Sequence, residues 1–110
     1  MWYRILTAQG LRQLRDHRAP ALKRDGRMAV YFFHLCNGHD VLLDREGREL
    51  EGEQAIAAIA LIEARAIIGD DALHGQIDLT QHIDVEDAMR NVVYRLDFRD
   101  AVALTLPEER

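Results

Sequence analysis

The stretch from Glu53 to Leu73 constrains the fold more than any other part of the chain. It contains no proline, no glycine before Gly69, and alanine at frequent intervals. Alanine is the strongest helix former, whereas glycine and proline are the weakest. The sequence therefore predicts one long helix over these residues, and Gly75 just beyond it suits a helix stop.

Apolar residues occupy two neighbouring faces of this predicted helix. One stripe holds Ala55, Ile59, Ile62, Ala66 and Leu73, and the other holds Ile56, Ala60 and Ile67. Between Ala55 and Ile68 only Glu63 and Arg65 are charged. A helix this apolar around its circumference needs cover on more than one side. We therefore expect a second copy of the chain to supply part of that cover, in a homo-oligomer.

A β-hairpin is predicted before the helix. The run from Ala29 to Leu35 is rich in aromatic and β-branched residues, which favour strands. Asn37-Gly38 follows, and both residues tolerate the positive φ of a tight loop. The return strand is then expected from about His39 to Leu43, with a turn at 44–47 in which Gly47 takes a left-handed conformation.

A second hairpin is predicted after the helix, with strands from about Ile77 to Val85 and from Val92 to Phe98. The last strand alternates apolar and polar residues, which is typical of a half-buried strand. Residues 99–106 fit either a short helical turn or an edge strand, and Pro107 ends regular structure. The predicted class is α+β, with two hairpins forming a mostly antiparallel sheet on one long helix, in the order ββαββ.

Charge divides the chain into two parts. The net charge is −5, but residues 1–27 carry seven basic and two acidic residues, and the remainder carries seven basic and seventeen acidic ones. Since phosphate contacts need Lys and Arg, nucleic acid is expected as a partner only through residues 1–27. We interpret 1–27 as a basic arm, 28–106 as the folded domain and 107–110 as a tail. Met28 precedes the first strand, so a start of translation there is an alternative.

Composition bears on the compartment. The single cysteine, Cys36, excludes an intramolecular disulfide. No stretch reaches the roughly 20 apolar residues of a membrane span, and the N-terminus lacks the continuous apolar core of a secretory signal. We expect a cytoplasmic protein without membrane contact.

The chain resembles the DUF6894 family. The resemblance rests on Tyr31-Phe32-Phe33-His34, Asn37-Gly38-His39, Asp44-x-x-Gly47, the alanine-rich helix and Phe98-Arg99-Asp100-Ala101-Val102. It covers residues 28–106 and implies a small bacterial protein of unassigned function. It points to no catalytic residues, because none are established for this family. This family usually has a glycine in the loop before its last strand, where this chain has Arg90-Asn91. Asn91 is expected to take the left-handed position there.

The best candidate for chemistry is His34-x-Cys36-x-x-His39. If Asn37 and Gly38 form the loop, Cys36 pairs with His39 and shares a face with His34. Thiolate sulfur and imidazole nitrogen are ligands of zinc, so a zinc site is one interpretation of these three residues. The alternative is a packed strand histidine and a cysteine that acts as a small hydrophobic residue.

The other sequence patterns give weaker indications of a functional site. Asp40, Asp44, Glu46 and Glu49 do not have the spacing of a calcium loop, and carboxylates are expected on a solvated turn. The chain contains no serine, and it has no glycine-rich phosphate loop. We therefore expect a non-enzymatic interaction module that self-associates, with an unknown protein as an alternative partner. The alternatives are a metal-binding protein that uses the first hairpin and a nucleic-acid accessory that uses the basic arm.

Overall fold

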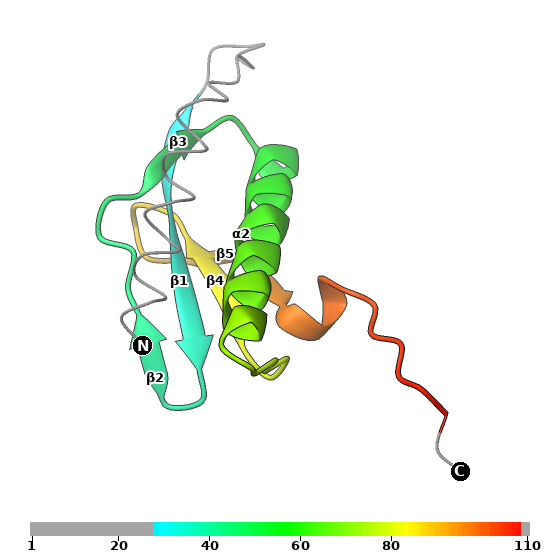
Figure 1. Ribbon diagram of the computed structural model, residues 1–110. Helices are drawn as coiled ribbons and strands as arrows, with labels where there is room; N and C mark the ends of the chain where they lie inside the picture. The colour runs from blue at the N-terminus through cyan, green and yellow to red at the C-terminus, as the bar shows by residue number, and fades with distance from the viewer. Residues whose placement is uncertain (1–27, 109–110) are drawn as a thin grey trace.

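The computed structural model describes residues 28–108, which form a five-stranded sheet with one long helix on one of its faces (Figure 1). The predicted basic arm, 1–27, lies outside the described residues. The elements are β1 (Ala29–Asn37), β2 (Asp40–Leu42), β3 (Arg48–Leu50), α2 (Glu53–Leu73), β4 (His82–Glu86), β5 (Val92–Asp97) and a 3₁₀ turn, η1 (Phe98–Asp100). The predicted α+β class is confirmed, and the helix has the predicted bounds.

The sheet is built around β1. All its strand pairs are antiparallel, in the order β2-β1-β4-β5, and β3 pairs with the N-terminal end of β1. The strand β3 was not predicted. It extends the sheet from four strands to five, pairing Tyr31 with Arg48 and Ala29 with Leu50.

The first hairpin turns one residue later than predicted. Cys36 pairs with Val41 and Asn37 with Asp40, so Gly38 and His39 form the loop. Gly38 has φ 61°, which suits a two-residue loop with glycine at its first position. His39 is therefore an exposed loop residue and does not pair with Cys36, contrary to the prediction.

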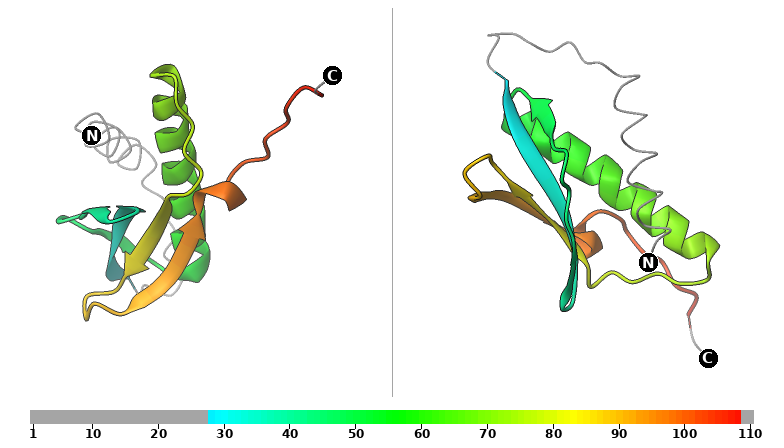
Figure 2. Two further views of the ribbon diagram at one scale, coloured as in Figure 1. Left: turned by 90° about the horizontal axis from the view of Figure 1, so that it is seen from below. Right: turned by 90° about the vertical axis from the view of Figure 1, so that its left-hand side faces the viewer.

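The core lies between α2 and one face of the sheet, and the views in Figure 2 show the helix on that side only. Ile56, Ala60 and Ile67 of the second predicted stripe are buried against Ile83 and Val85. The first predicted stripe is less buried. Its members Ile62 and Leu73 are 39% and 84% exposed.

A charged pair is buried at this interface. Arg48 of β3 donates from Nη2 to Oε2 of Glu63 on α2 at 2.9 Å, and both side chains are less than a tenth exposed. The Arg48 guanidinium also lies over the Phe33 ring, 4.7 Å from its centroid. A buried cation needs such partners, because desolvation of an unpaired charge is costly. The pair therefore ties β3 to the helix.

The second hairpin departs from the prediction at the start of its first strand and in its loop. The strand β4 starts at His82 rather than Ile77, because Asp78 bends the preceding backbone by accepting hydrogen bonds from the Thr80 N–H and hydroxyl. In the β4–β5 loop, Arg90 and not Asn91 has the left-handed conformation, with φ 67°. Asp87 accepts hydrogen bonds from the backbone of Met89 and Asn91, which leaves the left-handed position to Arg90.

The chain leaves the body of the domain after η1. Arg65 of α2 donates from Nε to the Ala101 carbonyl at 2.8 Å and anchors this point. Residues 102–108 then run without helix or strand, and beyond Val102 they project away from the helix and the sheet (Figures 1 and 2). Among the described residues, no helix has the length and apolar character that a membrane crossing requires.

Candidate functional site

Among the described residues, a group of polar and ionisable side chains lies on the sheet face opposite α2, hereafter the outer face. Alternation along each strand turns Phe33, Leu35, Ile83 and Val85 into the core. The residues between them, His34 and Cys36 on β1 and the three even-numbered residues of β4, therefore point to the outer face. Burial agrees with this alternation along β4, where Ile83 and Val85 are buried and their neighbours are half-buried.

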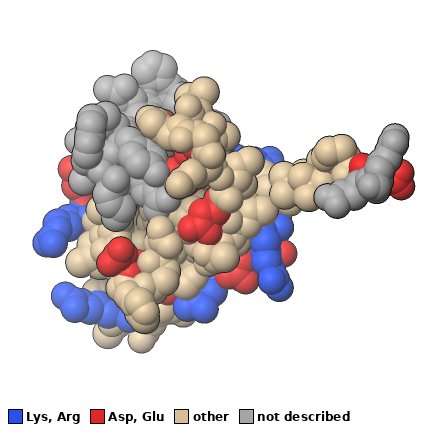
Figure 3. All heavy atoms as spheres, turned by 60° about the horizontal axis from the view of Figure 1, so that its bottom comes forward, with Lys and Arg blue, Asp and Glu red and all other residues tan. Residues whose placement is uncertain are grey.

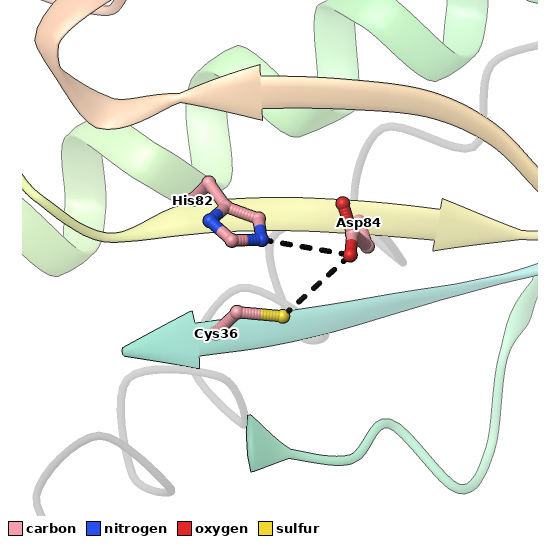
Figure 4. A group of neighbouring side chains, drawn as sticks. All are labelled: Cys36, His82 and Asp84. Carbon is pink, nitrogen blue, oxygen red and sulfur yellow. Dashed lines mark hydrogen bonds and ion pairs between the residues drawn. The ribbon is translucent and has the colours of Figure 1, made fainter. Parts of the chain in front are cut away.

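Asp84 lies at the centre of this face. Arg95 of β5 donates from Nε to Asp84 Oδ1 at 2.7 Å and from Nη2 to Oδ2 at 3.1 Å. His82 Nε2 lies 3.5 Å from Oδ2, and the Cys36 thiol donates to the same oxygen at 3.8 Å (Figure 4). Three strands thus each supply a side chain to one carboxylate.

The electrostatics of this cluster favour a carboxylate and a protonated thiol. Burial raises the pKa of the Cys36 thiol, and the negative charge of Asp84 and the hydrogen bond to it raise this pKa further. Burial also acts to raise the pKa of Asp84, but the hydrogen bonds and charge of Arg95 outweigh it and hold that pKa below its usual value. Since a thiolate is the nucleophilic form of cysteine, this arrangement does not activate Cys36.

His34 belongs to a second group on the same face. Its Nδ1 accepts a hydrogen bond from the Asp44 backbone N–H at 3.1 Å, so Nε2 carries the proton and points to Glu86 Oε1 at 3.3 Å. Its ring also stacks on Phe32, with centroids 6.5 Å apart. Both ring nitrogens therefore have protein partners.

Beside His34 the surface is hollowed by about 690 Å³, between the β2–β3 connection and the β4–β5 loop. Arg45 and Arg90 line this hollow together with the acidic residues Asp44, Glu86 and Asp87. Because charges of both signs meet there, the hollow does not select a ligand of one charge.

The structure separates the residues of the predicted zinc site. His34 and Cys36 share the outer face, but they interact with Glu86 and Asp84 respectively, and His39 is in the hairpin loop. The described residues instead bring ligand atoms of Cys36, His82 and Asp84 within 4.8 Å of one another. Zinc binding at the first hairpin stays a prediction.

Sequence reasoning missed His82, Asp84 and Arg95. A signal was present, because His82 and Asp84 occupy alternate positions of the predicted strand 77–85, and Arg95 lies in the predicted strand 92–98. What the sequence did not give was the pairing of β1 with β4, which places Cys36 opposite His82. Cys36 and His82 are so far apart in the chain that no local sequence pattern predicts their contact.

These features define a small α+β domain with a helix on one sheet face and a polar cluster on the other. A family model described as a domain of unknown function (DUF6894) matches residues 30–99, so the chain belongs to the DUF6894 family. The resemblance seen in the sequence is thereby confirmed. No curated protein and no solved structure matches the chain.

Proposed function

We propose that this protein is an interaction domain that self-associates, in which residues 102–106 of one copy pair as a strand with β5 of a second copy. The observation that carries this proposal is the extended, apolar segment that projects from the body of the domain.

The segment has the pattern of a half-buried strand. Val102, Leu104 and Leu106 alternate with Ala103 and Thr105, the period-2 spacing of a strand with one apolar face. Only Val102 packs against the core, whereas Leu104 is 55% and Leu106 73% exposed. In Figure 3 this segment is the uncharged part of the C-terminal extension that projects beyond the rest of the surface. Pro107 then ends the segment, since proline cannot donate to a strand ladder.

The strand β5 offers the complementary edge. It is a six-residue strand at the end of the sheet and pairs only with β4 among the described residues. An open edge presents unpaired backbone groups, and natural proteins usually protect such edges with lysine, proline or inward-pointing charges. Here Val92 and Val93 are 54% and 42% exposed, and Arg95 is turned over the outer face toward Asp84. The opposite edge strand, β2, has only three residues.

A second copy of the chain is the partner that fits best, because each chain carries both the apolar segment 102–106 and the open edge of β5. If each copy donates its segment and accepts its partner's, the two contacts are equivalent, as in a closed two-fold dimer. Fully burying a leucine side chain contributes about 1.5–3 kcal/mol, and four leucines enter such a dimer. Association costs several kcal/mol in lost translational and rotational freedom. The expected dimer therefore dissociates on dilution.

The test is light scattering of the full chain over a range of concentrations. The double variant Leu104→Asp/Leu106→Asp should be monomeric, because two charges cannot be buried against β5. A matched control is Leu73→Asp, which places a charge on an 84% exposed leucine at the end of α2. This control should associate as the unmodified chain does.

Hydrogen exchange locates the contact. In the associated protein, the β5 amides that do not bond to β4 should be protected, and this protection should be lost in the Leu104→Asp/Leu106→Asp variant. If association survives that variant, or if β2 amides are protected in place of β5 amides, the proposed pairing is wrong.

A further inference from the structure

We propose that Cys36, His82 and Asp84 form a binding site for a zinc-type divalent transition-metal ion on the outer face. The proposal is independent of self-association, because none of the three residues belongs to β5 or to residues 102–106. It also differs from the hairpin site expected from the sequence, with which it shares only Cys36.

Strand register brings the three ligands together. Cys36 and His82 are directly paired on β1 and β4, and Asp84 lies two residues further along β4. Successive side chains on a strand point to opposite faces, so residues two apart share a face. Figure 4 shows the side chains of Cys36 and His82 directed to Asp84 from these two strands.

The spacing of the ligand atoms is close to that of a tetrahedral site. Zinc binds sulfur at about 2.3 Å and nitrogen or oxygen at about 2.0–2.2 Å, which places neighbouring ligand atoms roughly 3.3–3.7 Å apart. Here His82 Nε2 is 3.5 Å and Cys36 Sγ 3.8 Å from Asp84 Oδ2, and all three lie within 4.8 Å of one another.

Arg95 does not block this site. Its shorter hydrogen bond goes to Oδ1, while the metal-facing oxygen is Oδ2, on which Arg95 keeps a longer contact at 3.1 Å. Carboxylates that bind metals are commonly hydrogen-bonded by such outer partners, which fix their orientation. Arg95 thus acts as a positioning residue for Asp84.

The donor set selects the class of ion. One thiolate, one imidazole and one carboxylate suit zinc and related transition metals, whereas calcium and magnesium require oxygen ligands. The thiol releases its proton to solvent when the metal binds, as metal-bound cysteines do. Three protein ligands leave a fourth position, which in zinc sites is filled by water or a small ligand. The His82 side chain is 26% exposed, so the ion can enter from solvent.

The test is a zinc titration of the reduced, chelator-treated full chain against a chromophoric competitor, with the stoichiometry measured by native mass spectrometry. We expect one zinc ion per chain. His82→Gln and Asp84→Asn should each weaken binding by more than about tenfold, because loss of an outer partner alone costs that much. Cobalt added in place of zinc should give a thiolate charge-transfer band that is absent from Cys36→Ser.

Two matched controls separate this site from its alternatives. Glu86→Gln removes a carboxylate from the same strand and face, and His39→Asn removes the loop histidine of the hairpin site; neither should change zinc affinity. Circular dichroism of each variant shows whether it is folded. The proposal is overturned if the folded unmodified chain retains no stoichiometric zinc, or if binding survives His82→Gln and is lost in His39→Asn.

Discussion

The Asp44 carboxylate accepts a hydrogen bond from the backbone N–H of Phe33 at 3.0 Å, in the middle of the β1 edge. At this point β1 has no partner strand on that side, because β2 pairs with residues 35–37 and β3 with residues 29–31. The same carboxylate accepts the backbone N–H groups of Glu46 and Gly47 at 3.1 and 3.0 Å. Asp44 therefore fills the gap between two short strands and fixes the turn that joins them.

The first prediction concerns this carboxylate. Asp44→Ala should lower the free energy of unfolding by about 3 kcal/mol, because it leaves three backbone donors without their charged acceptor. Urea denaturation measures the change. The control Glu49→Ala removes an exposed carboxylate from β3 and should cost less than about 0.5 kcal/mol. Equal losses in the two variants would show that Asp44 has no special structural role.

The second prediction concerns pH. Burial acts to raise the pKa of Asp44, but the hydrogen bonds from Phe33, Gly47 and Glu46 outweigh it, so this pKa lies below its usual value in the folded chain. As the pH falls, the Asp44 carboxylate is therefore protonated at a higher pH in the unfolded chain than in the folded chain. The stability that Asp44 contributes is lost as the pH falls below about 4. Urea denaturation at a series of pH values should show this loss, with a weaker dependence in Asp44→Asn. An unchanged dependence in that variant would contradict the assignment.

The third prediction compares two glycines with left-handed backbones. A Cβ on Gly47 would lie 2.8 Å from Phe32 Cε2 and 2.9 Å from Val30 Cγ1, whereas a Cβ on Gly38 meets nothing within 4 Å. Gly38→Ala should cost about 1 kcal/mol of stability from backbone strain alone. Gly47→Ala should cost at least about 1 kcal/mol more, because the Phe32 ring must move. Thermal unfolding of both variants measures the two losses of stability. Similar losses would show that the contact of the new Cβ with Phe32 has no effect.

The fourth prediction concerns the left-handed Arg90. A non-glycine residue in this conformation costs about 1–2 kcal/mol, part of which glycine loses again through its greater freedom in the unfolded chain. Arg90→Gly should therefore stabilise the domain by about 0.5–1 kcal/mol. Arg90→Ala removes the same side chain and keeps the strain, so it should give no gain. If both variants raise the midpoint of thermal unfolding equally, the side chain and not the backbone is responsible.

Local sequence signals predicted the elements that depend on local physics. The helix from Glu53 to Leu73 has its predicted bounds because alanine content and the absence of proline act within the segment itself. The strand β3 was missed because Arg48-Glu49-Leu50 carries two charges and is very short. Its stability comes from the pairing with β1 and from the contact of Arg48 with Glu63, both of which are long-range.

The candidate site shows the same limit. The sequence singles out Cys36, but it predicts the partners of this residue, His34 and His39, within the same hairpin. A shift of one residue in the loop, from Asn37-Gly38 to Gly38-His39, removes that pairing. The actual neighbours lie on β4, and only the register between β1 and β4 identifies them.

The molar mass of the full chain in solution shows whether the protein self-associates through residues 102–106. Light scattering at increasing protein concentration should give a mass that rises from the 12.6 kDa of one chain toward twice that value. The Leu104→Asp/Leu106→Asp variant should stay at the mass of one chain throughout. A mass of 12.6 kDa for the unmodified protein at every concentration would contradict self-association through residues 102–106.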